Sequence, residues 1–83
     1  MSDLNQQFLE AVAGSKSLSS RPDNETMLNL YALYKQGTQG DAPHEAPGDM
    51  MGMFKHKAWA ALAGLSKDAA QQKYIELVHA LSS

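Results

Sequence analysis

The chain has 83 residues, a formal net charge of −2 and no cysteine. A chain of this length has a modest core, and we expect one domain over residues 1–83. The charge is not typical of a nucleic-acid-binding protein, and the lack of cysteine excludes disulfides and thiolate metal sites. The sequence has neither a secretory leader pattern nor a run of about 20 apolar residues. We therefore expect a cytoplasmic protein with no integral membrane association.

The first predicted helix begins at Asp3, a common N-cap residue type, and ends near Gly14. Its apolar residues recur at helical spacing, at Leu4, Phe8, Ala11 and Val12. A polar connection over residues 15–22 follows.

The second predicted helix begins after Pro22 and ends near Gly37. Asp23 or Asn24 caps it, and its apolar residues are Met27, Leu30, Tyr31 and Tyr34. Residues 36–49 are rich in glycine and proline and are too many for a simple turn between neighbouring antiparallel helices. This length predicts a loop that crosses over the bundle.

Two further helices follow, the third from about Met50 to Leu62 and the fourth from Ser66 onward. The third has Met51, Phe54, Ala58 and Leu62 on one face, and Gly64 stops it. In the fourth helix, the apolar residues that we expect to face the core are Ala70, Tyr74, Leu77, Val78 and Leu81. Because no segment alternates with period two, the sequence predicts an all-α four-helix bundle.

Tyr31 and Lys35 are four residues apart, so on a helix they share a face. A phenol beside an ammonium suits a phosphorylated nucleotide, because both groups donate to phosphate oxygens and the ring can stack on a base. Lys55 and Tyr74 offer a second cation and a second phenol. Spacing alone is also typical of tyrosines that pack and lysines that face solvent, so both interpretations stay open at this point.

The segment from Tyr31 to Asp41 resembles the Y-x-x-Y-K-Q-x-T-x-G-D signature of the acyl-CoA-binding protein (diazepam-binding-inhibitor-like) family. Further similarities follow the family's order along nearly the whole chain, at Phe8, Lys16, Pro22, Met27-Leu28, Pro47-Gly48, Lys55, Ala58-Trp59, Ser66 to Ala69 and Tyr74-Ile75. The resemblance implies an up-down-down-up bundle, with an overhand loop joining the second and third helices.

The resemblance also implies a ligand site. Four residues would hold the 3′-phosphate of CoA: Tyr31, Lys35, Lys55 and Tyr74. Met27, Leu28, Tyr31 and Tyr34 would border the adenine, and Lys16 would approach the nucleotide from the other side. We accordingly expect non-catalytic binding, sequestration and intracellular transport of long-chain acyl-CoA by a monomer without a cofactor. Transient contact with enzymes that produce or consume acyl-CoA is also expected.

Two departures from the family pattern favour an alternative. His56 stands where the family commonly has a tryptophan, and the segment before Lys55 is shorter than usual and contains Met50, Met51 and Met53. A helical interaction module with weakened or lost ligand binding is therefore the second hypothesis.

Other chemistry has little support in the sequence. His44, His56 and His79 lack the spacing of a helical zinc site, so we interpret them as solvent-facing. Asp41, Glu45 and Asp49 do not match a calcium loop and are interpreted as solvated charges. No serine stands in a nucleophile elbow or beside a paired base, so we expect neither a metal site nor an enzyme.

Overall fold

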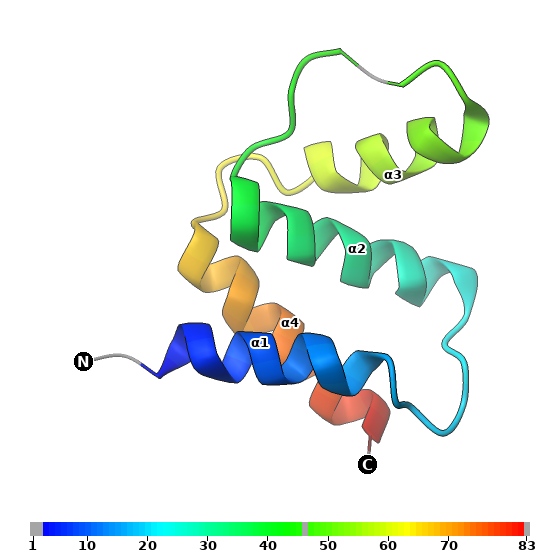
Figure 1. The fold of residues 1–83 in the computed structure, drawn as a ribbon. Coiled ribbons are helices and arrows are strands. Elements are labelled where there is room, and N and C mark those ends of the chain that lie inside the picture. Colours follow the sequence, from blue (N-terminus) through cyan, green and yellow to red (C-terminus); the bar gives the residue numbers. More distant parts are fainter. Residues whose placement is uncertain (1–2, 46, 83) are drawn as a thin grey trace.

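The computed structural model describes residues 3–45 and 47–82, and this part of the chain forms four α-helices and no strand (Figure 1). Their bounds are Leu4–Ser15 (α1), Asn24–Gln39 (α2), Met50–Ala60 (α3) and Lys67–Ser82 (α4). The predicted all-α class is confirmed.

The connection between α2 and α3 is the predicted overhand loop. α2 and α3 run in the same direction, because residues 40–45 and 47–49 lie along the return path that precedes α3 (Figure 1). α4 packs against α1 and α2, whereas α3 packs against α2. The molecule measures 34 × 33 × 15 Å along its principal axes, so α3 lies at the edge of a flat bundle.

The hydrophobic core lies between α1, α2 and α4. Its buried cluster comprises Phe8, Ala11, Leu30, Leu33, Ala70, Tyr74, Ile75 and Val78. α3 has one buried residue, Trp59, which lies outside this cluster. The predicted apolar face of α3 is therefore only partly correct: Leu62 packs against the core, but Met51 and Phe54 are exposed.

Two helices begin at aspartates that cap them. Asp23 Oδ1 accepts a hydrogen bond from Thr26 N at 2.8 Å, and Asp49 Oδ2 accepts one from Gly52 N at 2.9 Å. A hydrogen bond from the Thr26 side chain, together with this backbone bond, holds the pKa of Asp23 below its ordinary value. Asp3 also precedes a helix, but its side chain makes no capping bond. Asp49 is exposed, as expected of a solvated loop charge, and it also caps a helix, which the sequence analysis did not predict.

α2 continues through Gly37, contrary to the sequence-based prediction, and ends at Gln39. Gly37 faces α4, where an added Cβ would lie 3.0 Å from Gln71 Cγ, so the missing side chain permits close helix packing. The helix stops at Gly40, whose φ of 84° is accessible chiefly to glycine. The prediction placed the stop one glycine too early.

A network of hydrogen bonds fixes the far end of α2 to both flanking loops. Gln36, which is fully buried, donates from Nε2 to Asp41 Oδ1 and to the Leu65 carbonyl, each at 2.8 Å. Asp41 Oδ1 also accepts from Gly64 N at 3.0 Å. Asp41 is exposed, as expected of a solvated loop charge, but it also has a structural role that the sequence did not indicate.

α3 is attached to the overhand loop through two side chains. Trp59 Nε1 donates to the Gly40 carbonyl at 2.7 Å, and His56 Nε2 donates to the Pro43 carbonyl at 2.6 Å. His56 is half-buried, so its interpretation as a solvent-facing histidine was wrong, whereas His44 and His79 are exposed. These bonds set the position of α3 relative to α2, and so shape the space between them.

Candidate functional site

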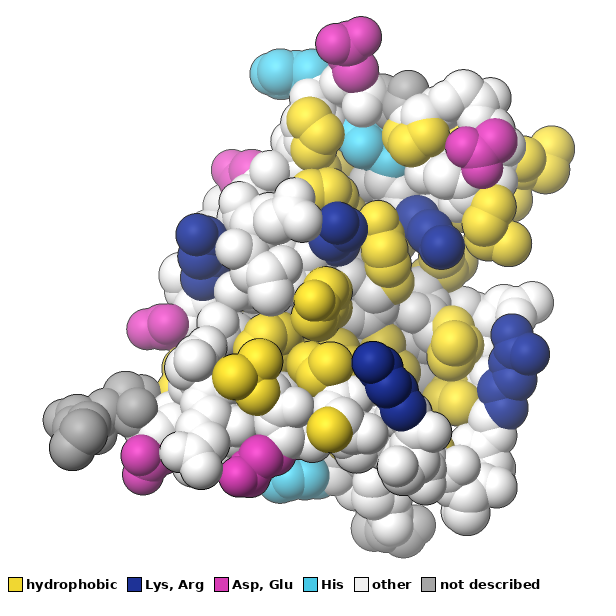
Figure 2. All heavy atoms as spheres, in the orientation of Figure 1, with side chains coloured by type: hydrophobic (Ala, Val, Ile, Leu, Met, Phe, Trp, Pro, Cys, Tyr) yellow, Lys and Arg dark blue, Asp and Glu magenta, His cyan; other side chains and the backbone are white. Residues whose placement is uncertain are grey.

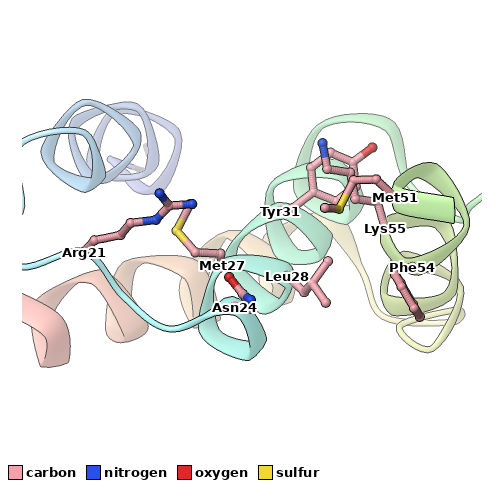
Figure 3. Close-up of a pocket in the computed structure, with 8 residues that line it drawn as sticks. All are labelled: Arg21, Asn24, Met27, Leu28, Tyr31, Met51, Phe54 and Lys55. Carbon is pink, nitrogen blue, oxygen red and sulfur yellow. The ribbon is translucent and has the colours of Figure 1, made fainter. Parts of the chain in front are cut away.

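A pocket of about 630 Å³ lies between α2, α3 and the connection that precedes α2 (Figure 3). Its lining is mostly apolar and consists of Arg21, Asn24, Met27, Leu28, Tyr31, Met51, Phe54 and Lys55. Figure 3 shows Met27, Leu28 and Tyr31 projecting from α2, and Met51 and Lys55 from α3.

Two ammonium groups converge on the ring of Tyr31. Lys55 Nζ lies 5.2 Å from the ring centre and Lys35 Nζ lies 5.9 Å from it. Lys35 Nζ is also 5.5 Å from the Trp59 ring, so cation–π contacts hold its charge beside the pocket. In the described part of the chain, neither lysine pairs with a carboxylate. Two unneutralised cations beside an apolar pocket suit a ligand that joins an anionic group to a hydrocarbon portion.

Four of the residues predicted from the resemblance thus line one pocket: Met27, Leu28, Tyr31 and Lys55. Lys35 lies beside them, within cation–π distance of Tyr31. The sequence could place Lys35 and Tyr31 on one face of α2, but only the packing of α3 against α2 brings Lys55 to the same ring.

The other three predicted residues lie outside the pocket lining. Tyr34 projects toward α1, where its ring stacks against Phe8 with 6.0 Å between ring centres. Lys16 is exposed directly after the end of α1. Tyr74 is only 4% exposed, and its hydroxyl donates to Ser15 Oγ at 3.1 Å. The predicted contacts of these three residues with a ligand stay predictions.

Three pocket residues were absent from the predicted site: Arg21, Asn24 and Phe54. Arg21 belongs to the polar connection, where no helical periodicity indicates which way a side chain points. Its position directly before Pro22 and the Asp23 cap was the available signal, because both restrict the backbone there. Figure 3 shows the Arg21 guanidinium beside Met27, on the opposite side of the pocket from Lys55.

The charges on this face of the molecule are distributed unevenly. Figure 2 shows lysine and arginine side chains around a central group of hydrophobic side chains, while acidic side chains lie toward the outline. A net negative chain therefore presents a locally positive surface around apolar groups. Fold and site together define a small helical protein that binds an amphiphilic anion.

Comparison with known proteins identifies the class more closely. Residues 5–78 match the family described as "Acyl CoA binding protein". The chain belongs to the acyl-CoA-binding protein family. Members of this family bind acyl-CoA esters, so the resemblance and the predicted class of function are confirmed.

Individual relatives agree with this assignment. The chain is 46% identical over 76 residues to acyl-CoA-binding protein homolog 1 of Caenorhabditis elegans, which covers 89% of this chain and 88% of the relative. It superposes on the crystal structure of Oryza sativa acyl-CoA-binding protein 2 with a TM-score of 0.89 at 38% identity, covering 94% of this chain and 89% of the other. It is also 45% identical over 80 residues to enoyl-CoA delta isomerase 2 of Rattus norvegicus, covering 94% of this chain but 20% of that enzyme.

Two other kinds of site are absent from the described residues. No helix in the described residues is long and apolar enough to cross a membrane. Over residues 3–45 and 47–82, no group of His, Cys, Asp and Glu side chains is arranged to hold a metal ion.

Proposed function

We propose that this protein binds one long-chain acyl-CoA ester, sequesters it and transports it, without catalysis and without a cofactor. The observation behind the proposal is the pairing of Lys35 and Lys55 around Tyr31 beside an apolar pocket. The ester has the matching chemistry, because its nucleotide phosphates are anionic and its acyl chain is a hydrocarbon.

The two halves of the ligand would contribute separately to binding. Each well-formed hydrogen bond from an ammonium or phenol to phosphate contributes about 1.5–3 kcal/mol. Burying the acyl chain contributes about 0.8 kcal/mol for each methylene removed from water. We therefore expect the complete ester to bind far more tightly than CoA or a free fatty acid.

The residue roles come from the family resemblance, and the convergence of Lys35 and Lys55 on the Tyr31 ring supports them. Lys35, Lys55 and the Tyr31 hydroxyl are assigned to the 3′-phosphate, and Met27 and Leu28 border the adenine. Tyr34, Lys16 and Tyr74 belong to the same proposal on the strength of the resemblance. Tyr74 would have to redirect its hydroxyl from Ser15 Oγ, which lies on α1, to donate to a phosphate.

The alternative, an interaction module with weakened or lost ligand binding, is favoured by one observation. The N-terminal half of α3 exposes large apolar side chains, including Met50 and Phe54 at 73% and 53%. In the carrier Phe54, which lines the pocket, borders the acyl chain. In an interaction module the exposed apolar side chains of α3 would instead contact a partner protein.

Calorimetric titration with palmitoyl-CoA, kept below its micelle concentration, distinguishes the two functions. Coenzyme A and palmitate serve as parallel controls. One-to-one binding of the ester, much tighter than that of either fragment, supports the carrier. No heat with any of the three, from a protein shown by circular dichroism to be folded, would exclude the carrier and favour the interaction module.

Three further statements belong to the same proposal. The protein is non-catalytic, acts as a cytoplasmic monomer, and makes transient contact with enzymes that produce or consume acyl-CoA. Sustained release of free thiol from palmitoyl-CoA would contradict the first, and sedimentation of the ligand-bound protein at twice the monomer mass would contradict the second.

A further inference from the structure

Methionine thioethers surround the candidate pocket on two sides. Met27 on α2 and Met51 on α3 line it. Met50 directly precedes Met51, and Met53 follows it after Gly52. Their exposed fractions are 40%, 60%, 73% and 52%, respectively, so solvent and small solutes reach all four side chains. Because the chain has no cysteine, its sulfur chemistry is confined to methionine.

Exposed thioethers have a well-defined oxidation chemistry. A peroxide transfers one oxygen atom to the sulfur, which gives the sulfoxide, and the peroxide is reduced to water or an alcohol. The step needs no metal, and methionine sulfoxide reductases reverse it. It converts a flexible apolar side chain into a polar one.

We propose that Met27 and Met51 are peroxide-oxidation sites whose conversion to sulfoxides lowers the affinity of the pocket for acyl-CoA. This inference rests on the proposed function. In the free protein a sulfoxide oxygen at either position is hydrated. A bound acyl-CoA would cover the pocket wall and remove that water, so the sulfoxide dipole would lose its hydrogen bonds to solvent.

The positions of the four methionines distinguish an effect of oxidation on the pocket from an effect on the stability of the fold. Met50 and Met53 are not part of the pocket lining, so their sulfoxides stay hydrated when the ligand binds. The buried core cluster contains no methionine, so oxidation at these sites leaves the packing of α1, α2 and α4 intact. A loss of affinity would therefore come from the pocket and not from unfolding.

The experiment compares three proteins before and after treatment with hydrogen peroxide: wild type, M27L/M51L, and M50L/M53L as the matched control. Leucine is close to methionine in volume, so both double variants are expected to fold. Mass spectrometry locates the sulfoxides, circular dichroism checks folding, and calorimetry gives the dissociation constant for palmitoyl-CoA.

The readout is the ratio of affinities before and after peroxide for each protein. We expect wild type and M50L/M53L to lose about tenfold, which is the effect of one desolvated polar group, and M27L/M51L to change little. Methionine sulfoxide reductase should restore the wild-type affinity.

Two results would overturn the inference. One is unchanged affinity in wild type that carries sulfoxides at Met27 and Met51. The other is an equal loss in M27L/M51L and wild type. If unoxidised wild type fails to bind palmitoyl-CoA, then the proposed function itself fails and takes this inference with it.

Discussion

The ammonium of Lys35 lies within cation–π distance of two aromatic rings, those of Tyr31 and Trp59. A long side chain held in this way loses less conformational entropy on binding an anion than a free surface lysine does. We expect K35A to weaken palmitoyl-CoA binding by about 10- to 100-fold, the value of one charge-assisted hydrogen bond. Y31F should weaken it less, because the ring remains and only the hydroxyl is lost.

Calorimetry on the purified variants measures both effects. K73A is the matched control, since Lys73 is exposed on α4 and is not part of the pocket lining. Equal affinities in wild type, K35A and Y31F would show that the 3′-phosphate does not bind where we place it.

Asp41 couples the stability of the fold to pH. Hydrogen bonds from the Gln36 side chain and from Gly64 N hold the pKa of its carboxyl below the ordinary value. Because the pKa is lower in the folded than in the unfolded state, the ionised form stabilises the fold at neutral pH. That contribution is lost as the pH falls below about 4 and through the folded-state pKa.

The expected result is that D41N is less stable than wild type at pH 7, and that the difference in free energy of unfolding shrinks below about pH 4. Urea unfolding of both proteins over a pH series measures it. Asparagine keeps an oxygen acceptor in the same place, so the comparison isolates the charge. A difference that does not vary with pH would contradict this account.

At the scale of the element, glycines decide where α2 ends and how closely it packs. Gly40 has φ 84° and ψ −149°, a conformation that is essentially restricted to glycine. G40A should therefore lower the free energy of unfolding by about 1–3 kcal/mol.

Gly14 in α1 has ordinary helical geometry, and an added Cβ would meet Val78 Cγ1 at 3.9 Å. G14A should raise stability by about 0.5–1 kcal/mol through helix propensity.

Urea or thermal unfolding measures the change in the free energy of unfolding of both variants. The same replacement, glycine by alanine, is expected to change it in opposite directions at the two positions. Destabilisation by G14A, or no effect of G40A, would show that the backbone conformations assigned to these positions are wrong.

The helices also show where a pattern in the sequence is informative. The periodicity of α1, α2 and α4 indicated their buried faces correctly at Phe8, Leu30 and Tyr74, because each of these helices packs against the core. α3 packs against one neighbour, so most of its apolar residues remain exposed whichever face they occupy. Its orientation is set by the bond from Trp59 to the Gly40 carbonyl, which no periodicity in α3 encodes.

At the scale of the whole molecule, the flat arrangement leaves α3 with the least support. It contacts α2, and Trp59 is its buried residue, whereas α4 contacts both α1 and α2. Segments with few buried contacts open at lower free energy than the core does. We expect amides in residues 53–57 to exchange hydrogen faster than amides in residues 30–36 and 74–78.

Hydrogen exchange with and without palmitoyl-CoA measures this difference. Because the pocket lies between α2 and α3, the ligand should slow exchange most strongly in α3. Uniform exchange in the free protein, or protection confined to α1 and α4, would contradict the placement of the site.

The sequence by itself determined the helical class, the overhand loop and the placement of Tyr31 and Lys35 on one face of a helix. Each depends on spacing within one segment or on glycine and proline in a connection, and such local features are readable along the chain. The resemblance to the family assigned Lys55 and Tyr74 to the same site, although spacing cannot show which residues from different helices converge. Only the tertiary structure decided that Lys55 meets Tyr31, that Arg21 and Phe54 line the pocket, and that Tyr74 is buried with its hydroxyl on Ser15. The physical reason is that these contacts depend on how α3 and α4 pack against α2, and that packing is set by long-range bonds from Gln36, Asp41 and Trp59.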